Sequence, residues 1–405
     1  MHTIKKTKDF LLHHLSKPFL WLFMSVVIGG LVGTSSALFL FILDWVTATR
    51  MEHPLWLLGL PLGGLFVGGL YHYMGGTANK GNNLLIQAYH HPAESIPLKL
   101  APLVLVGTWI THLFGGSAGR EGTAVQMGGA IAAQFMRLFK LGTFDRQALL
   151  LMGISGGFAS VFGTPLAGAL FALELMVVGR IQYKHMLPVV ATAFLSHWVC
   201  LSWGISHTVY TVDVLPNFDL LTLLKVCLAG LLFGFTAIVF VKATDAVAHW
   251  TTKVIVYPPL RPFIGGIVLL GLYWMIRDPR FLGLGIETIV DSFAHAQAYS
   301  VFLLKILFTA LTLGTGFKGG EVTPLFFIGA TLGSFLGIYL QVPIGFLAAL
   351  GFVAVFAGAT KTPLACICMA GELFGGEILI YAALACFLAY RISGKHGIYK
   401  FQLYL

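Results

Sequence analysis

Charged residues are scarce in this sequence. Lysine, arginine, aspartate and glutamate make up only 10% of the 405 residues, whereas hydrophobic residues make up 57%. Ordinary soluble domains carry about 25% charged residues, so the composition excludes a soluble globular protein. The mean hydropathy of +0.86 indicates an integral membrane protein instead.

Cysteine is also scarce. The five cysteines all lie inside apolar stretches, where a thiol behaves as a small core residue rather than as part of a disulfide framework. Cys366 and Cys368 are separated by one residue, which fits no common zinc spacing. The HExxH metalloprotease motif is missing as well. We therefore expect no metal site, no cofactor and no enzymatic activity, with an intramembrane enzyme as the rival class.

Apolar stretches recur along the chain, and several are long enough to span a membrane as helices. Examples are residues 18–43, 54–74 and 226–241. From Val322 to Thr360 no charged residue appears, and the sequence PIGFL at 343–347 predicts two passes broken at the proline. Nothing alternates as in a transmembrane β-barrel. The predicted fold class is therefore all-α and polytopic.

Basic residues gather at the termini and in short loops. Lys5, Lys6, Lys8 and Lys17 precede the first apolar stretch, which predicts that the N-terminal segment stays attached and lies in the cytoplasm. The formal net charge of +9 also suits a nucleic-acid-binding protein. Because the sequence contains no soluble basic domain, we expect membrane lipid as its surroundings and no nucleic-acid partner.

Two pairs of segments indicate an internal duplication. TPLAGALFALEL begins at residue 164 and TPLACICMAGEL at residue 362, and each ends in a Glu-Leu pair, with Glu174 or Glu372. REGTAVQMGGA at residue 120 aligns with GEVTPLFFIGA at residue 320, which superposes Glu121 on Glu321. Two matches in the same order at nearly one separation are typical of transporters whose two halves meet at the bilayer midplane.

Glycine-rich segments interrupt the apolar runs at 75–83, 115–122 and 314–324. They favour broken helices, whose free amides face a ligand instead of lipid. If Gly119 to Gly122 form the entry to a helix, its first turn creates an anion site that the Glu121 carboxylate can itself fill. A glutamate that competes with an anion and leaves when protonated is both gate and proton carrier. Arg120 is interpreted as loop support, because neighbouring helix residues do not face each other.

The segment GREGTAVQMGG at 119–129 resembles the signature of CLC-type anion channels and proton-coupled anion exchangers, in which GREGP precedes VQxGG. TPLAGALFALE and the C-terminal GKHGIY are similar to the same family, so the resemblance covers nearly the whole chain. It implies a CLC-type fold with inverted repeats and a homodimer with one pore per subunit. It also implies that Glu121 is the external gating glutamate and that Tyr399 reaches the central anion site.

Three departures from the common family pattern carry information on the substrate. Asn82 stands where chloride-transporting members have the serine of GSGIP, Thr123 replaces the proline after GREG, and Glu321 lies in GEVTP where they have GxFxP. Together they are similar to the subgroup of bacterial fluoride/proton antiporters. Leu175 occupies the position of the internal proton-transfer glutamate, which agrees with that subgroup and leaves the inner proton route open.

The resemblance predicts a proton-coupled fluoride exporter of the bacterial inner membrane, with fluoride and protons as substrates. A chloride or nitrate exchanger and a passive anion channel of the same fold are the alternatives. Fluoride is small and strongly hydrated, so it leaves water only where many compact donors converge. The expected anion-binding residues are Gly81, Asn82, Asn83, Gly122, Thr123, Val322, Thr323 and Tyr399. Glu321 has two interpretations of equal weight: a protonatable group beside the anion, or a structural residue paired with Lys318 or with loop amides.

Four regions follow from the duplication and the resemblance. They are a cytoplasmic N-terminal segment at 1–17, a first membrane repeat at 18–205, a second membrane repeat at 206–392, and a C-terminal segment at 393–405 that reaches the anion site. Both termini are expected in the cytoplasm, and no regulatory domain is expected after Tyr399.

Overall fold

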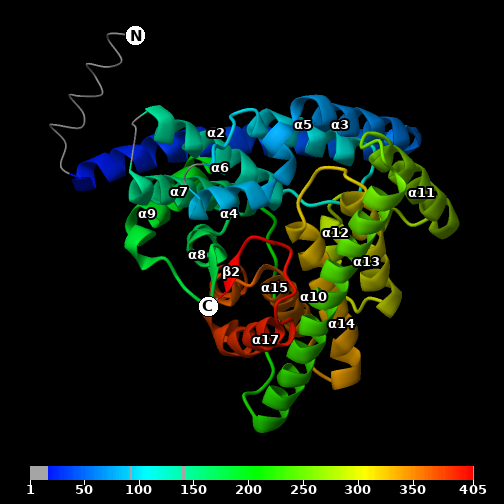
Figure 1. The fold of residues 1–405 in the computed structure, drawn as a ribbon. Helices are drawn as coiled ribbons and strands as arrows, with labels where there is room; N and C mark the ends of the chain where they lie inside the picture. The colour runs from blue at the N-terminus through cyan, green and yellow to red at the C-terminus, as the bar shows by residue number, and fades with distance from the viewer. Residues whose placement is uncertain (1–16, 92–93, 139–141, 405) are drawn as a thin grey trace, which may run out of the picture.

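The computed structural model describes residues 17–91, 94–138 and 142–404, and nearly all of its regular structure is helical (Figure 1). The predictions made for Lys5, Lys6 and Lys8 therefore lie outside the described residues. The α-helices of the first half are α2 (Lys17–Glu52), α3 (Leu60–Met74), α4 (Asn82–His90), α5 (Leu100–Leu113), α6 (Glu121–Leu138), α7 (Thr143–Phe162), α8 (Pro165–Leu175) and α9 (Met186–Ser202). Those of the second half are α10 (Leu220–Val254), α11 (Leu260–Ile276), α12 (Ile286–Ala294), α13 (Tyr299–Gly314), α14 (Val322–Leu340), α15 (Ile344–Thr360), α16 (Pro363–Phe374) and α17 (Leu379–Ile392).

Short elements connect these helices. The 3-10 helices are η1 (Pro54–Gly59), η2 (Gly76–Lys80), η3 (Tyr183–His185), η4 (Pro279–Phe281) and η5 (Gly376–Ile378). Two strands of two residues each, β1 (Val177–Val178) and β2 (Leu403–Tyr404), pair in parallel. Five segments of the described chain are long and apolar enough to cross a membrane, and six further apolar helices are shorter. The all-α, polytopic fold class is confirmed.

The uncharged stretch from Val322 to Thr360 forms two helices, as its proline predicts. α14 ends at Leu340 and α15 begins at Ile344, with Pro343 immediately before it. Gln341 between them adopts a left-handed conformation, with φ of 51°. The chain reverses there, so α14 and α15 pack against each other along their lengths.

The contact between α14 and α15 has a counterpart in the first half of the chain. A Cβ atom added at Gly329 of α14 would collide with the carbonyl oxygen of Gly351 in α15. In the same way, a Cβ at Gly128 of α6 would collide with the carbonyl oxygen of Gly153 in α7. Both helix pairs therefore approach at backbone distance, which only glycine permits. The matching element order fits the predicted duplication, whose boundaries stay predictions.

The two Thr-Pro-Leu-Ala segments exchange helix caps. At the end of α8, the Glu174 carboxylate accepts hydrogen bonds from the backbone N–H groups of Leu364 (3.2 Å) and Ala365 (2.9 Å) in α16. At the end of α16, Glu372 accepts from Leu166 (2.9 Å) and Ala167 (2.7 Å) in α8. Each carboxylate thus satisfies the free N–H groups of the other half's helix.

Removing one of these caps should lower the stability of the fold. Glu372→Ala leaves the N–H groups of Leu166 and Ala167 unpaired, and we expect a loss of about 2 kcal/mol in the free energy of unfolding. Thermal unfolding of the detergent-solubilised protein measures this as a lower Tm. Glu377→Ala is the control, because Glu377 is exposed in η5; an equal drop in both variants would contradict the cap.

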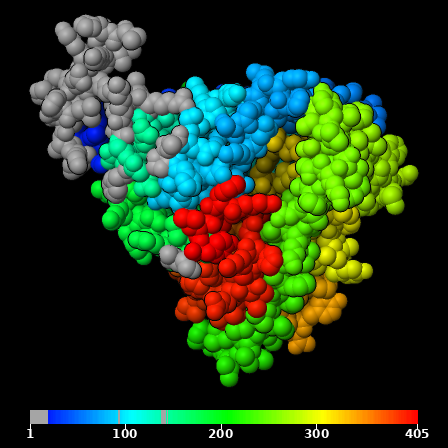
Figure 2. Space-filling model, in the orientation of Figure 1, coloured from blue at the N-terminus to red at the C-terminus, as the bar shows by residue number. Residues whose placement is uncertain are grey.

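The C-terminal segment returns across the surface to join both halves. In Figure 2 it lies between the helices of the first half and α10. The N–H of Ile398 donates to Ala359 O (2.9 Å), and Lys400 Nζ pairs with Asp245 Oδ1 of α10 (2.7 Å). The segment is therefore held against the second half before it reaches the first.

Candidate functional site

Two glycine loops meet at the centre of the molecule. Gly119 precedes α6, Gly320 precedes α14, and the two residues exchange backbone hydrogen bonds of 2.6 and 2.8 Å. A Cβ atom at Gly119 would lie 2.9 Å from Thr323 N, and one at Gly320 would lie 2.8 Å from Gly122 N. Side chains are excluded at both positions, so the N-terminal ends of α6 and α14 come together.

Glu121 is the first residue of α6, and its carboxylate binds the other half of the protein. Its Oε2 accepts from Thr323 N (3.1 Å) and Thr323 Oγ1 (2.6 Å) in α14, and from Arg120 N (3.3 Å). The side chain is only 1% exposed. The carboxylate therefore takes one donor, Arg120 N, from the Gly119–Gly122 entry and two donors from α14 of the other half. The Gly119–Gly320 contact brings the amide of Thr323 in α14 within hydrogen-bond distance of the carboxylate.

Arg120 lies nearer to Glu121 than the helix rule for neighbouring residues suggests. Its Nε is 3.7 Å from Glu121 Oε1, a charge contact longer than a hydrogen bond. Arg120 precedes α6, so its side chain is not bound by helical geometry. Its Nε is buried without a hydrogen-bond partner, and its backbone N–H also lies 3.4 Å from Thr323 Oγ1.

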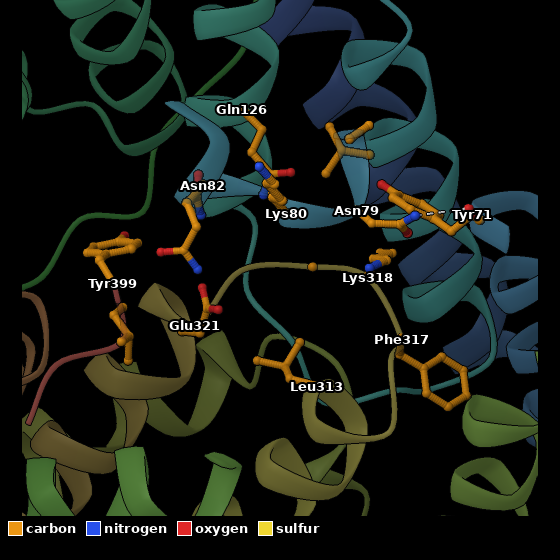
Figure 3. Close-up of a pocket in the computed structure, with 16 residues that line it drawn as sticks. Tyr71, Asn79, Lys80, Asn82, Gln126, Leu313, Phe317, Lys318, Glu321 and Tyr399 are labelled. Atoms are coloured by element: carbon orange, nitrogen blue, oxygen red, sulfur yellow. Dashed lines mark hydrogen bonds between the residues drawn. The ribbon is translucent and has the colours of Figure 1, made fainter. Parts of the chain in front are cut away.

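A polar cavity of about 160 Å³ lies beside this contact. Asn82 and Glu321 point toward each other across it, and Tyr399 closes one side (Figure 3). Asn82 Oδ1 and Glu321 Oε2 are both buried without a hydrogen-bond partner. Buried polar atoms of this kind normally have partners, so the cavity is suited to a polar or ionic guest.

Gly122 stands between Glu121 and the cavity. A Cβ atom there would lie 3.2 Å from Asn82 Nδ2 and 3.6 Å from Glu321 Oε2. The backbone of the first turn of α6 therefore lies close to the same two side chains that face the cavity, and a larger residue at Gly122 would crowd them. Four of the residues discussed from sequence, Glu121, Gly122, Asn82 and Glu321, meet here.

The C-terminal segment completes the cavity wall. Tyr399 is 4% exposed and lines the cavity, as the resemblance implies. Lys400 N donates to Asn83 Oδ1 (3.0 Å), which ties the segment to α4. Asn83 thus uses its carbonyl oxygen for structure, and its amide nitrogen is the group left for an anion.

The other predicted anion-binding residues differ in their surroundings. Thr323 holds that carboxylate, and Thr123 Oγ1 shares a hydrogen bond of 2.7 Å with Thr108 Oγ1. Val322, the first residue of α14, is buried. Gly81 does line the cavity, and its φ of 56° requires a left-handed backbone that favours glycine. Their contacts with an anion remain predictions.

Glu321 and Lys318 form no ion pair in the described part of the chain. The Lys318 ammonium instead lies over the Tyr71 ring, 4.2 Å from its centre. Pairing with Lys318, one form of the structural interpretation of Glu321, is therefore not observed. Sequence reasoning did not foresee Tyr71, Lys318 or Gln126 as cavity-lining residues.

Leu175 is buried, and its backbone binds the C-terminal segment. Its carbonyl oxygen accepts from Gln402 Nε2 (2.9 Å), which also donates to Thr360 O (2.9 Å). The preceding Glu174 is engaged by the amides of α16. Sequence reasoning used Glu174 and Glu372 only as markers of the duplication. Each glutamate lies at the same distance from its Thr-Pro-Leu-Ala segment, and this spacing was the one sequence feature that hinted at the exchange of helix caps.

Paired broken helices around a polar cavity define a membrane protein that handles ions, and comparison with known proteins identifies its class. The chain belongs to the voltage-gated chloride channel family, the CLC family, whose model matches residues 63–394. It is 48% identical over 390 residues to the chloride/fluoride channel protein of Pseudomonas syringae pv. tomato, covering 94% of this chain and 86% of the relative. It is 27% identical to the H(+)/Cl(-) exchange transporter ClcA of Vibrio parahaemolyticus, with 95% and 89% covered.

Solved structures agree with this assignment. The crystal structure of a CLC-type fluoride/proton antiporter superposes with a TM-score of 0.92 at 36% identity, covering 97% of this chain and all of that one. A slow cyanobacterial Cl-/H+ antiporter superposes with a TM-score of 0.79 at 20% identity, with 94% and 96% covered, which supports the fold alone. The CLC-type fold expected from the sequence is confirmed, and the chain is a multi-pass membrane protein.

Proposed function

We propose that this protein is a proton-coupled fluoride exporter. The observation that carries the proposal is the placement of Asn82 and Glu321 across one cavity, with a buried unpaired oxygen on each. Both residues distinguish the sequence from the chloride-transporting pattern. The 48% identical relative named for chloride and fluoride, and the similar fluoride/proton antiporter structure, support the same assignment.

Competition between Glu121 and the anion couples the two substrates. The carboxylate occupies the N–H and hydroxyl donors of Thr323 at the positive end of α14. An arriving fluoride binds the same donors only after Glu121 leaves. Protonation favours departure, because it removes the negative charge that the donors stabilise. Each exchange of carboxylate for fluoride therefore moves a proton on Glu121.

Compact donors around the cavity suit fluoride. The carboxamide nitrogen of Asn82 and the phenol of Tyr399 are small hydrogen-bond donors held by the backbone of α4 and the C-terminal segment. A protonated Glu321 donates a further hydrogen bond, whereas an ionised Glu321 repels the anion. The cavity therefore replaces the lost hydration of fluoride while Glu321 is neutral.

Coupled flux measurements test this function against chloride exchange and passive conduction. Purified protein is reconstituted into liposomes that are loaded with fluoride or with chloride. Anion efflux and proton uptake are then recorded together. We expect fluoride efflux matched by proton uptake and much slower chloride efflux. Equal rates for the two anions point to a chloride exchanger, and efflux without proton uptake points to a channel; either result overturns the proposal.

Asn82→Ser restores the residue of the chloride-transporting pattern and should weaken selectivity. A serine hydroxyl replaces the longer carboxamide, so the donor at this position no longer reaches as far into the cavity. We expect the fluoride-to-chloride flux ratio to fall by about tenfold, equivalent to ~1.4 kcal/mol. Asn217→Ser, in an exposed loop, is the control. An unchanged ratio in Asn82→Ser places selectivity elsewhere.

The assembly and orientation belong to the same proposal. We infer a homodimer with one pore per subunit and both termini in the cytoplasm, as the family resemblance implies. Light scattering of the solubilised protein should give a protein mass of about twice 43.9 kDa. Impermeant thiol reagents applied to intact cells should spare a cysteine introduced at Lys395, near the C-terminus.

A further inference from the structure

A second space opens beside the cavity of Asn82 and Glu321. It measures about 310 Å³ and lies between the C-terminal end of α3, the N-terminal end of α11, and the loop before α14. Tyr71, Asn79 and Lys318 line both spaces. We call the second space the antechamber. The two spaces are therefore neighbours that share part of one wall.

The antechamber is basic. Lys318, Arg261 and His72 line it, and no acidic residue does so in the described part of the chain. Arg261 Nε donates to Ile255 O (2.9 Å), which orients the guanidinium. Neither Arg261 nor Lys318 belongs to an ion pair among the described residues. Their charges therefore stay available to a mobile anion.

Local packing holds Lys318 in this place. Its stem crosses Gly107 of α5, where an added Cβ atom would lie 2.9 Å from Lys318 Cβ. Its ammonium lies over the Tyr71 ring and makes no hydrogen bond to any other described residue. A ring attracts a cation without neutralising it as a carboxylate does. In Figure 3 both side chains lie on the side of the cavity away from Tyr399.

Tyr71 supplies a second, independent sign of a ligand. The residue is 4% exposed, and its hydroxyl is buried without a hydrogen-bond partner. A buried phenol normally finds a partner. Here it belongs to the wall that the two spaces share, next to an unpaired ammonium. The hydroxyl and the ammonium both lack a hydrogen-bond partner among the described residues.

We propose that the antechamber is a second anion site, which holds a hydrated halide beside Lys318, Arg261 and the Tyr71 hydroxyl before it reaches the cavity. Its volume of about 310 Å³ accepts an anion together with water molecules. Because its charges are not arranged around one small ion, it selects by charge rather than by size. This inference rests on the proposed function in one respect, because it takes the transported anion as the ligand of the antechamber.

Bromide detects this site independently of fluoride transport. Crystals soaked in bromide should show anomalous density in contact with Lys318 Nζ in the parent protein and in Lys253→Met. Lys253 is an exposed lysine in the last turn of α10, and it precedes Arg261 by only a few residues in the sequence. Lys318→Met should lose the density. An empty antechamber in the parent, or bromide retained in Lys318→Met, overturns the proposal.

Transport kinetics test whether the antechamber affects fluoride transport. Loss of a local positive charge lowers the anion concentration at the cavity entrance, so Lys318→Met should raise the apparent KM for fluoride by about tenfold. Lys253→Met, which changes an exposed lysine of α10, should leave the KM and the maximal rate within about twofold of the parent. Tyr71→Phe, which keeps the ring under Lys318, should raise the KM in the same direction and guards against a folding defect in Lys318→Met. Unchanged KM values in both variants contradict the site. Uncoupled transport together with bound bromide overturns only the proposed antiport.

Discussion

Glu121→Gln should abolish proton movement while leaving anion movement measurable. Glutamine keeps the shape of the side chain and an oxygen that accepts from Thr323, but it cannot take up and release a proton. We expect proton uptake in fluoride-loaded liposomes to fall by about 100-fold or more. Fluoride efflux then proceeds without the matching proton signal.

The control for this experiment is Glu52→Gln. Glu52 is an exposed acid at the end of α2, so its replacement should leave both fluxes unchanged. Proton uptake that persists in Glu121→Gln at the parent rate rules out Glu121 as the proton carrier. The exchange with fluoride at α14 would then require another titratable group.

Replacement of Glu321 should separate its possible roles. Two carboxylates aimed at one region repel when both are ionised, so Glu321 must spend part of the cycle protonated if it faces the anion. Gln keeps a donor at Glu321 and removes titration, whereas Ala removes both. If Glu321 acts as a neutral donor, Glu321→Gln retains much of the fluoride flux and Glu321→Ala loses about 100-fold. If it must titrate, both variants lose transport.

Normal coupled fluoride transport in Glu321→Ala contradicts both roles and leaves a structural one. A folding defect is recognised separately, by thermal unfolding of the parent and of Glu321→Ala; Glu321 Oε2 itself makes no hydrogen bond to a described residue. Equal Tm values for the parent and Glu321→Ala, together with lost flux, assign the loss to transport. The comparison of Tm with flux therefore distinguishes a folded variant that has lost transport from a misfolded variant.

Much of the site was predictable from the sequence because its signals are local. Glycines beside Glu121 and Glu321 predicted broken helices, and the structure begins α6 at Glu121 and α14 at Val322, directly after Glu321. The proline at 343 predicted the break between α14 and α15. The duplication showed that two such helix starts exist. Resemblance added Tyr399, which lines the cavity in the structure.

Contacts between segments about two hundred residues apart were not predictable. Nothing near Glu121 in the sequence shows that its carboxylate accepts from Thr323 rather than from its own helix. The exchange of caps between Glu174 and Glu372 depends likewise on the packing of α8 against α16. Such contacts form when two distant segments of backbone approach each other, and local sequence patterns do not predict that approach.

The sequence by itself determined the membrane class, the helical fold, the two interrupted helices and the acids at their starts, because composition, periodicity and glycine placement act locally. Only the tertiary structure decided which donors hold Glu121, that Asn82 and Glu321 share a cavity, and that Lys318 lies over Tyr71 between two spaces. Those arrangements require the close glycine contact between the halves, and a contact of that kind exists only after the chain has folded.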